Sequence, residues 1–394
     1  MKRVRLGLLG AAGGIAGMHK SYFDKIDGLE LAAVCDVSDE RVAPVAEATG
    51  ARAWTDGEAM IRSGEIDAVL IACPHFDHPR YARIAFDAGV HALTEKPVAV
   101  TAAEAEETDR LYAEAQKEHP GLLYAGMFNQ RTHPVWKEIK RLVAGGELGE
   151  LMRVGWTIST WFRTQSYYDS GGWRATWSGE GGGVLLNQCP HNLDLLCWFV
   201  GQPSRVIAKA SLGKQHAIEV EDEVSALLDF PNGATGTFFT STGEAPGVNR
   251  LEIVGTGGTV ICEDNKLTFL RAGTPVDEFT RTCSAKFATL PTTRMEVTPP
   301  PLEGPEHEHI TRNFVETILA GGGQGDLIAP APEGILGLEL GNAMLMSGLQ
   351  GSFPIDLPMD RAAFAAKLKE LQAASTYVKP EVKEAEGDLA KSFA

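Results

Sequence analysis

The first third of the chain alternates short apolar segments with stretches of helical pattern, and this alternation limits the fold more than any other feature. The apolar segments are residues 4–9, 29–35, 66–73 and 90–94. The third, Ile-Asp-Ala-Val-Leu-Ile-Ala-Cys, is nearly all apolar, as expected for a parallel strand that is buried on both faces. Strands separated by helices predict right-handed crossovers, and therefore a doubly wound parallel sheet of the α/β class.

The turn after the first apolar segment is rich in glycine and leads into a segment that can start a helix. It contains Gly10, Gly13 and Gly14, followed by Ile15 and Ala16. A strand, a glycine turn and a helix N-terminus form a phosphate cradle, because small residues allow close approach and free N–H groups face the anion. The dinucleotide fingerprint is matched only in its second half, and the turn is one residue longer than usual. An ordinary glycine-rich turn explains this pattern equally well.

The second apolar segment ends at Asp36, in the position where a carboxylate binds the ribose hydroxyls of a dinucleotide. A carboxylate there repels a 2′-phosphate, so Asp36 favours NAD over NADP. Arg41 follows closely and leaves NADP open. The alternative is an aspartate that only caps the turn after the strand.

The second half of the chain has a different pattern, in which apolar and polar residues alternate. Such segments occupy residues 151–160, 204–212, 224–230, 234–241, 251–254, 259–262 and 267–271. Alternation of period two with Gly, Pro and Asn turns predicts an open antiparallel sheet with helices on one face. Residues 272–305 are rich in Pro and Thr and are predicted to form a loop. The segments 306–319 and 332–347 are predicted to be helical.

A chain of 394 residues is too long for one typical core, so more than one domain is expected. The change of pattern places a dinucleotide-binding domain in residues 1–127 and a substrate and oligomerisation domain of α+β type in 128–360. Residues 361–394 are predicted to form a C-terminal helix and a mobile charged tail.

Charge and composition exclude several classes of protein. The formal net charge of −16 argues against binding to nucleic acid or to an anionic membrane surface. Apolar runs are too short for a membrane span. Six scattered cysteines without a Cys-x-x-Cys pair indicate reduced thiols in the cytoplasm. His307 and His309 have no third ligand at suitable spacing, so we expect no metal.

Residues 181–194, Gly-Gly-Gly-Val-Leu-Leu-Asn-Gln-Cys-Pro-His-Asn-Leu-Asp, carry a polar stripe in an apolar setting. Asn187, His191 and Asp194 are four and three residues apart, so one helix would present them on the same face. This spacing predicts the wall of a pocket behind three glycines. The alternative is a core helix with one hydrogen-bonded histidine.

An ordered series of motifs resembles the Gfo/Idh/MocA family, named after glucose–fructose oxidoreductase and inositol dehydrogenase. It begins with the glycine turn and Glu95-Lys96-Pro97, and continues through Phe128-Asn129-Gln130-Arg131 and the Gly-x-Leu-Gly-Glu of residues 146–150. It includes the stretch 181–194 and the C-terminal segments 313–315, 331–334 and 357–360. The resemblance implies a Rossmann domain, sheet faces that pair in a homodimer or homotetramer, and hydride transfer between NAD and a sugar, sugar derivative or cyclitol.

The resemblance also implies roles for individual residues. Lys96 and His191 match catalytic residues, and the tasks they would share are taking the hydroxyl proton and stabilising the alkoxide. Asn187 departs from the family, whose inositol dehydrogenases usually carry an ionisable Asp here, so we expect Asn187 to position the hydroxyl instead. The cofactor-binding set is predicted to be Gly10, Gly13, Gly14, Ile15, Ala16, Asp36, Pro74, His78, Glu95, Lys96, Asn129, Trp173 and Arg174. The substrate-binding set is predicted to be Lys96, Arg174, Asn187, His191 and Asp194. For Asp194, contact with a sugar hydroxyl and buttressing of the helix are equally good interpretations.

The absence of an Asp at position 187 leaves other functions open. An enzyme that retains NAD and uses transient oxidation to cleave a glycosidic bond is one alternative. A sugar- or dinucleotide-sensing regulator that has lost catalysis is another, although the presence of Lys96 and His191 argues against it.

Overall fold

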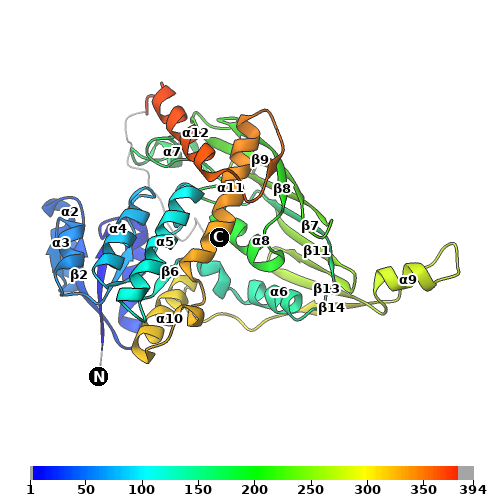
Figure 1. Cartoon of the computed structure of the whole chain (residues 1–394), viewed down its shortest axis with the longest axis horizontal. Coiled ribbons are helices and arrows are strands. Elements are labelled where there is room, and N and C mark those ends of the chain that lie inside the picture. The colour runs from blue at the N-terminus through cyan, green and yellow to red at the C-terminus, as the bar shows by residue number, and fades with distance from the viewer. Residues whose placement is uncertain (1–2, 380–394) are drawn as a thin grey trace.

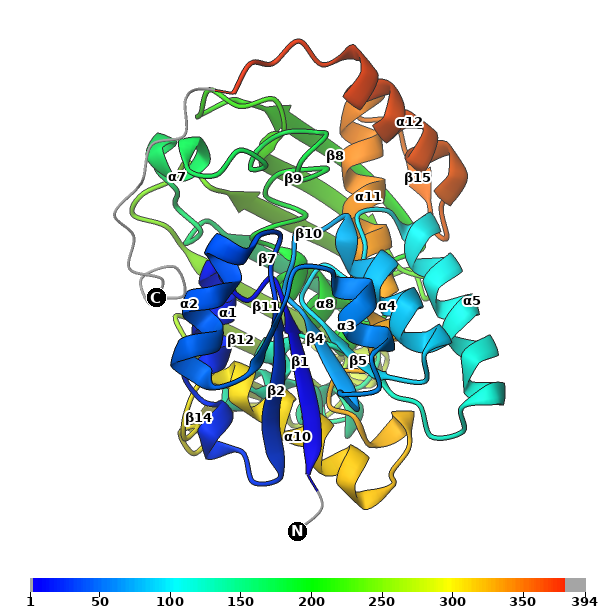
Figure 2. The same ribbon diagram turned by 90° about the vertical axis from the view of Figure 1, so that its left-hand side faces the viewer.

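A computed structural model describes residues 3–379, and it contains two β-sheets with helices packed between and around them (Figure 1). The first sheet has six strands in the order β3-β2-β1-β4-β5-β6, and the second has nine in the order β14-β13-β12-β11-β7-β10-β9-β8-β15. Figure 2 looks along the first sheet, with helices on both of its sides.

The first sheet is parallel throughout and confirms the predicted doubly wound fold. Its strands are β1 (Val4–Leu9), β2 (Leu29–Cys35), β3 (Arg52–Trp54), β4 (Ala68–Ile71), β5 (His91–Thr94) and β6 (Tyr124–Gly126). The crossovers contain α1 (Gly14–Lys20), α2 (Asp39–Thr49), α3 (Gly57–Arg62), α4 (Asp77–Asp87) and α5 (Ala102–Glu118). The strand order reverses between β1 and β4, and doubly wound sheets bind their ligands beyond the carboxyl ends of the strands at such a point.

The second sheet is mixed rather than purely antiparallel. Its strands are β7 (Leu151–Ile158), β8 (Arg205–Leu212), β9 (Glu221–Asp229), β10 (Thr235–Ser241), β11 (Asn249–Gly255), β12 (Gly258–Glu263), β13 (Lys266–Ala272), β14 (Thr292–Val297) and β15 (Ile355–Asp356). Strands β7 and β10 pair in parallel, and the other pairs are antiparallel. Side-chain alternation does not encode strand direction, so the sequence could not reveal this pair.

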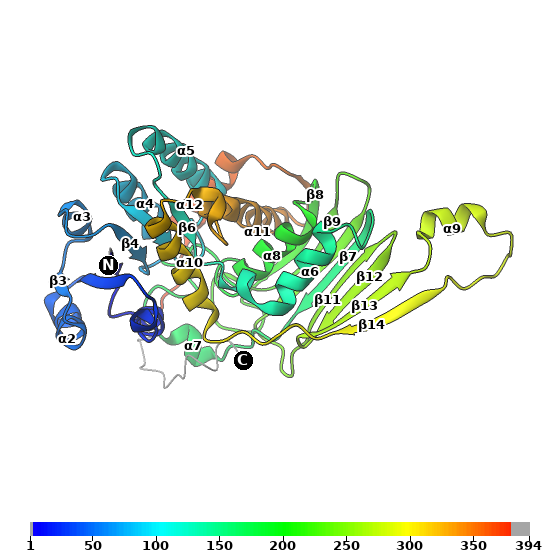
Figure 3. The same ribbon diagram turned by 90° about the horizontal axis from the view of Figure 1, so that it is seen from below.

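Helices cover one side of the second sheet. Figure 3 shows α6 (Pro134–Ala144), α8 (Pro190–Val200) and α11 (Gly334–Leu349) on the side that faces the parallel sheet. Along β7, Val154, Trp156 and Ile158 are buried beneath them, as the alternation predicted. On the opposite side the Leu227 side chain is 58% exposed.

The predicted loop 272–305 contains regular structure. Helix α9 (Val276–Thr282) and strand β14 lie within it, and Figure 3 shows them projecting with β13 at one end of the molecule. Strand β14 has no fully buried residue, so it lacks the apolar alternation that would have revealed it.

The C-terminal third returns to the first sheet. Helix α10 (Glu306–Ala320) confirms one predicted helix, and its Thr311 hydroxyl lies 3.1 Å from the Tyr22 hydroxyl of the N-terminal part. Ala125 of β6 forms a bridge with Pro330. Residues 306–330 therefore contact the first sheet and the segment around Tyr22, although sequence order places them in the predicted second domain.

The last described helix is α12 (Arg361–Ala374), where Arg361 pairs with Glu339 of α11. The Lys379 ammonium donates to the main-chain oxygen of Arg174 at 2.6 Å, so this end of the predicted tail is anchored. The rest of the predicted tail, residues 380–394, lies outside the described residues.

Shorter helical elements are α7 (Gln165–Asp169) and the 3₁₀ turns Phe23–Lys25, Asn129–Thr132, Gln324–Asp326 and Ala331–Glu333. Among residues 3–379, none of the helices combines the length and apolar character needed to span a bilayer.

Candidate active site

The turn between β1 and α1 has the geometry of a phosphate cradle. Gly10 has φ +74°, and a Cβ there would lie 2.5 Å from the main-chain oxygen of Ala72 in the neighbouring β4 segment. The Gly13 N–H bonds to the Gly10 oxygen at 2.9 Å, and α1 begins at Gly14 without a side-chain cap. Glycine at position 10 therefore brings the chain close to β4 and leaves the helix N-terminus open to an anion.

Asp36 lies directly after β2, beside this turn. Its carboxylate accepts hydrogen bonds from the Ala12 N–H at 2.9 Å and from the Arg41 Nε at 2.6 Å. Burial would raise the pKa of Asp36, but these bonds and that from the Val37 N–H outweigh it and hold the pKa below its usual value. Asp36 is therefore charged and tied to the glycine turn, with Arg41 at its side.

Lys96 joins the two halves of the molecule. It follows β5 and is linked to Pro97 by a cis peptide bond. Its Nζ donates to the main-chain oxygen of Asn187 at 2.9 Å. Burial lowers the pKa of the Lys96 ammonium, while the charges of Glu95 and Glu180 act in the opposite direction.

His191 lies in the first turn of α8 and is 4% exposed. Burial and the positive charge of Lys96 place the pKa of His191 well below its ordinary value, so the ring is neutral near pH 7. The Nδ1 atom of His191 is buried without a hydrogen-bond partner. A neutral imidazole with an unused nitrogen is suited to exchange a hydrogen bond or a proton with a ligand.

The predicted helix face formed by Asn187, His191 and Asp194 is wrong in one respect, because α8 begins only at Pro190. Proline favours the first position of a helix, since its missing N–H would have no partner there. Before it the chain runs through turns, in which the Asn187 N–H bonds to the Gly183 oxygen at 2.9 Å. Asn187 therefore reaches the site from a turn, and His191 reaches it from the helix.

The side chain of Asn187 contacts a carboxylate that the sequence did not reveal. Its amide nitrogen donates to Glu180, which is 2% exposed. Burial raises the pKa of Glu180, while hydrogen bonds from Ala175 and Asn187 and the charges of Arg174 and Lys96 oppose the rise. An acidic residue directly before three glycines is a signal in retrospect, but spacing alone does not indicate that it turns back onto Asn187.

Asp194 is engaged by an arginine. Its two oxygens accept from Nε and Nη2 of Arg131 at 2.8 and 2.6 Å, and both side chains are buried. Arg131 also pairs with Glu333, which joins α8 to the start of α11. This geometry favours the buttressing interpretation of Asp194 over contact with a sugar hydroxyl.

Comparison with known proteins shows the family to which this chain belongs. The family described as "Oxidoreductase family, NAD-binding Rossmann fold" matches residues 4–119, and the GFO/IDH/MocA C-terminal domain matches residues 136–261. Together the two matches cover more than half of the chain. The chain belongs to the Gfo/Idh/MocA family of NAD-binding oxidoreductases.

Three similar members of the Gfo/Idh/MocA family illustrate its range. An inositol 2-dehydrogenase of Rubrobacter xylanophilus is 28% identical over 263 residues, which cover 66% of this chain and 71% of the relative. A D-glucoside 3-dehydrogenase of Escherichia coli is 28% identical over 269 residues, which cover 64% and 73%. The WlbA dehydrogenase of Chromobacterium violaceum, solved with NADH and UDP-GlcNAcA, superposes with a TM-score of 0.76 at 26% identity, covering 91% and 97%.

The residues at the carboxyl ends of β1 and β2 in the first sheet are suited to bind a dinucleotide. The close approach at Gly10, the open N-terminus of α1 and the charged Asp36 are what pyrophosphate and ribose require. The Trp173 ring packs edge to face on the His75 ring, with the ring centres 5.4 Å apart. The loop that holds Trp173 in the second half of the chain therefore contacts the segment that follows β4 in the first half. Arg174 stacks on Trp173 and on Tyr167 at 4.7 and 4.5 Å.

Three predicted cofactor ligands have other partners. The His78 ring lies between the main-chain oxygens of Cys73 and Pro97, at 2.8 and 2.7 Å, so it braces the Lys96 turn. Glu95 points inward to His19, at 2.8 Å. Asn129 donates to Glu306 at 2.8 Å, and its Oδ1 is buried without a partner. These side chains organise the site, and ligand contact by them stays a prediction.

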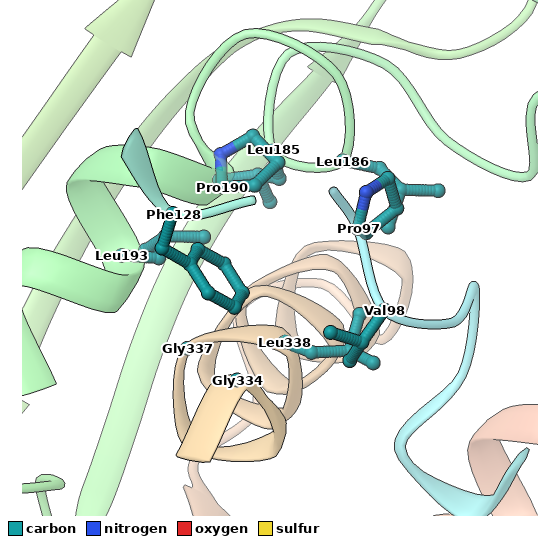
Figure 4. A pocket seen from close by; sticks show the side chains of 10 residues that line it. All are labelled: Pro97, Val98, Phe128, Leu185, Leu186, Pro190, Leu193, Gly334, Gly337 and Leu338. Carbon is teal, nitrogen blue, oxygen red and sulfur yellow. The ribbon is translucent and has the colours of Figure 1, made fainter. Parts of the chain in front are cut away.

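Figure 4 shows an apolar cavity whose lining includes Pro97 and Pro190, the chain neighbours of Lys96 and His191. It is lined in part by Pro97, Pro190, Leu193 and Gly337 and has a volume of about 10 Å³. Such a space holds at most one water, so it is a packing gap rather than a substrate site. A Cβ at Gly337 would lie 2.8 Å from the main-chain nitrogen of Asp194, so glycine allows α11 to approach α8. Among residues 3–379 no cluster of three or more His, Cys, Asp or Glu side chains could hold a metal ion.

Proposed function

We propose that the protein is an NAD-dependent dehydrogenase that oxidises a secondary alcohol of a sugar, sugar derivative or cyclitol, or reduces the corresponding ketone. The observation that carries this proposal is that Lys96 of the Rossmann domain lies next to Asn187 and His191 of the second half. Its Nζ donates to the Asn187 main-chain oxygen, and its charge acts on His191. Lys96 lies just beyond the carboxyl end of β5, and the segment that follows β4 is its neighbour in the parallel sheet. The names of the inositol and glucoside dehydrogenases support the substrate class.

The residues divide the work of alcohol oxidation. Bound NAD supplies the hydride acceptor, held by the Gly10–Ala16 turn and Asp36. Lys96 and neutral His191 share the hydroxyl proton, since burial lowers the pKa of each toward the working range or below it. When Lys96 is protonated, its ammonium stabilises negative charge on the reacting oxygen. Asn187 cannot ionise, and its amide orients the hydroxyl.

The neighbouring aromatic loop suits a sugar ring. Tyr167 accepts a hydrogen bond from Arg174 at 2.7 Å, and the Gln188 amide lies 3.1 Å from the same hydroxyl. Aromatic faces with hydrogen-bonding side chains at their edges bind carbohydrate by stacking and by polar contacts. We propose that Arg174 and Tyr167 form one wall of the substrate site.

The test is an NADH-formation screen with purified protein against inositols, aldoses, anhydrosugars and glycosides. A rise in NADH absorbance with one class of polyol supports the dehydrogenase and identifies its substrate class. Release of sugar from a glycoside without net NADH contradicts the proposal and supports the redox-assisted glycosidase. Tight dinucleotide binding without turnover in either direction supports the sensor.

Cofactor choice is expected to depend on Asp36. Wild-type protein should bind NAD more tightly than NADP, because the Asp36 carboxylate repels a 2′-phosphate. In Asp36→Ala the charge is lost and Arg41 is released from its 2.6 Å pair, so the preference should shift toward NADP by about tenfold or more, the factor for ~1.4 kcal/mol. Fluorescence titration with both dinucleotides measures the ratio. Tighter NADP binding by the wild type would refute the NAD assignment, and Arg41→Ala is the matched control for the arginine.

We also propose a homodimer or homotetramer in the cytoplasm. The outer side of the nine-stranded sheet carries exposed apolar side chains, including Leu227 and Met152, that a second copy would cover. The six cysteines are free thiols, which suits a reducing compartment. Light scattering of wild type and Leu227→Glu tests the assembly, and an unchanged mass in the variant would argue against this face.

A further inference from the structure

We propose that Glu180 is a positioning residue of this site, which turns the Asn187 amide oxygen toward the reacting hydroxyl and places a negative charge beside Lys96. The proposal deepens the dehydrogenase function and rests on it. Position 187 holds an amide that cannot carry charge, and the carboxylate in contact with that amide is Glu180.

Glu180 is held in place by the loop before it. Its second oxygen accepts from the Ala175 N–H at 2.5 Å, and Ala175 is fully buried with φ +55°. An L-residue in this left-handed region is strained, and such strain persists where surrounding structure enforces it. Here the strained backbone delivers an N–H to one oxygen of a buried carboxylate, which fixes the direction in which the Glu180 side chain points.

The contact with Glu180 fixes which way the Asn187 amide faces. A carboxylate only accepts hydrogen bonds, so Asn187 must offer its NH₂ group and its Oδ1 must face away. No donor among the described residues contacts that oxygen, and the side chain is partly exposed. The Oδ1 atom is therefore available to accept the hydrogen bond of a substrate hydroxyl.

Glu180 also acts on Lys96 through its charge. The Lys96 ammonium donates to the main-chain oxygen of Asn187, and the Asn187 side chain donates to Glu180, so the three residues form one connected unit. Other charged or titratable groups facing Lys96 are Glu95, Arg163, Arg174, His75, His78, Cys189, His191 and His307. Those facing Glu180 also include Tyr168, Glu221 and Lys379. Of the carboxylates, Glu95 and Glu180 raise the pKa of Lys96.

The first test needs no substrate. The pH dependence of acetylation of Lys96 by acetic anhydride, followed by peptide mass spectrometry, reports the pKa of its amine. In Glu180→Gln the cation loses a neighbouring negative charge, so the pKa of Lys96 should fall by about one pH unit. In Glu180→Gln/Asn187→Asp the charge is relocated, and the pKa should return toward the wild-type value. An unchanged pKa in Glu180→Gln overturns the electrostatic part of the proposal.

Glu219 provides a matched control. It lies in the connection between β8 and β9, and it accepts at 2.8 Å from the N–H of Trp177, which belongs to the loop that holds Glu180. It is not among the groups that act on Lys96. Glu219→Gln should leave the pKa of Lys96 unchanged. A purely structural role for Glu180 would make the two variants alike in both thermal stability and Lys96 pKa, and that result refutes the proposal.

The second test uses turnover of the polyol found in the screen. Glu180→Gln should lower kcat by about 10- to 100-fold at the alkaline plateau, the cost of losing one hydrogen bond to a charged group. The acid limb of the oxidation profile should move to lower pH with the Lys96 pKa. Glu180→Asp keeps the charge but shortens the side chain, so it should lower kcat without moving that limb, and it serves if the glutamine variant does not fold.

The outcomes separate the two proposals. A wild type without turnover, together with the expected fall in the Lys96 pKa, rejects the dehydrogenase function and retains the unit formed by Glu180, Asn187 and Lys96. An active wild type with kcat and pH profile unchanged in Glu180→Gln rejects the role of Glu180 and retains the function.

Discussion

Replacing Lys96 by methionine is expected to lower kcat for polyol oxidation by about 10²- to 10⁴-fold, the range for loss of a proton-transfer group. Methionine keeps the length of the side chain but can neither exchange a proton nor stabilise an alkoxide. The hydrogen bond from Nζ to the Asn187 oxygen, 2.9 Å in the wild type, is also lost. Steady-state kinetics measures kcat, and fluorescence titration should show that the variant still binds NAD.

Lys140 supplies the control for this result. It is also a partly buried lysine whose pKa is lowered by burial, and it donates to a main-chain oxygen, that of Trp198 at the end of α8. Lys140→Met should therefore keep kcat near the wild-type value. Equal losses in both lysine variants would show that packing, not proton chemistry, explains the effect at Lys96.

Removal of Arg131 is expected to have the largest effect on stability. Arg131→Met leaves the Asp194 carboxylate buried without its partner, and broken buried ion pairs cost about 3–5 kcal/mol. The free energy of unfolding from urea titration should fall by that amount. Glu333, the other partner of Arg131, is 49% exposed and can be solvated by water.

The pH dependence of this loss has a definite sign. Burial raises the pKa of Asp194 and Arg131 opposes the rise, so removing the arginine raises the pKa further. The folded variant then binds a proton that the unfolded chain has released, and its stability falls as pH rises through this window above the ordinary value of 3.8. The loss should therefore be smaller near pH 5 than near pH 8. The double variant Arg131→Met/Asp194→Asn should recover part of the lost free energy of unfolding. If Arg131→Met lowers that free energy by less than about 1 kcal/mol, the pair contributes no more than an exposed ion pair, which contradicts this account.

Much of the fold followed from the sequence because periodicity reports burial directly. The apolar segment 66–73 predicted a doubly covered strand, and β4 is buried at each of its four residues. Alternation along 151–160 gave β7 and its covered face. Periodicity does not encode the relative direction of paired strands, so the parallel pairing of β7 with β10 was not predicted. It also does not show which distant segments pack together, so the contact of residues 306–330 with the first sheet was not predicted.

For the site, sequence reasoning found residues that local motifs carry and missed those that long-range contacts create. Lys96 and His191 stand in short motifs. In the structure the Lys96 Nζ donates to the Asn187 main-chain oxygen, and the charge of Lys96 acts on His191. Glu180 has no motif of its own, and the role we propose for it depends on a strained turn at Ala175 that a sequence pattern does not show. The helical spacing of Asn187 was misleading because Pro190 delays the start of α8.

The central claim is direct hydride transfer from a polyol carbon to the nicotinamide, and isotope tracing tests it most directly. The polyol found in the screen would be prepared with deuterium on the oxidised carbon and incubated with NAD and wild-type protein. We predict that the NADH recovered carries deuterium at C4, and that unlabelled polyol in D₂O gives NADH without it. NADH that carries deuterium from the solvent, or none from the labelled polyol, would contradict the proposed reaction.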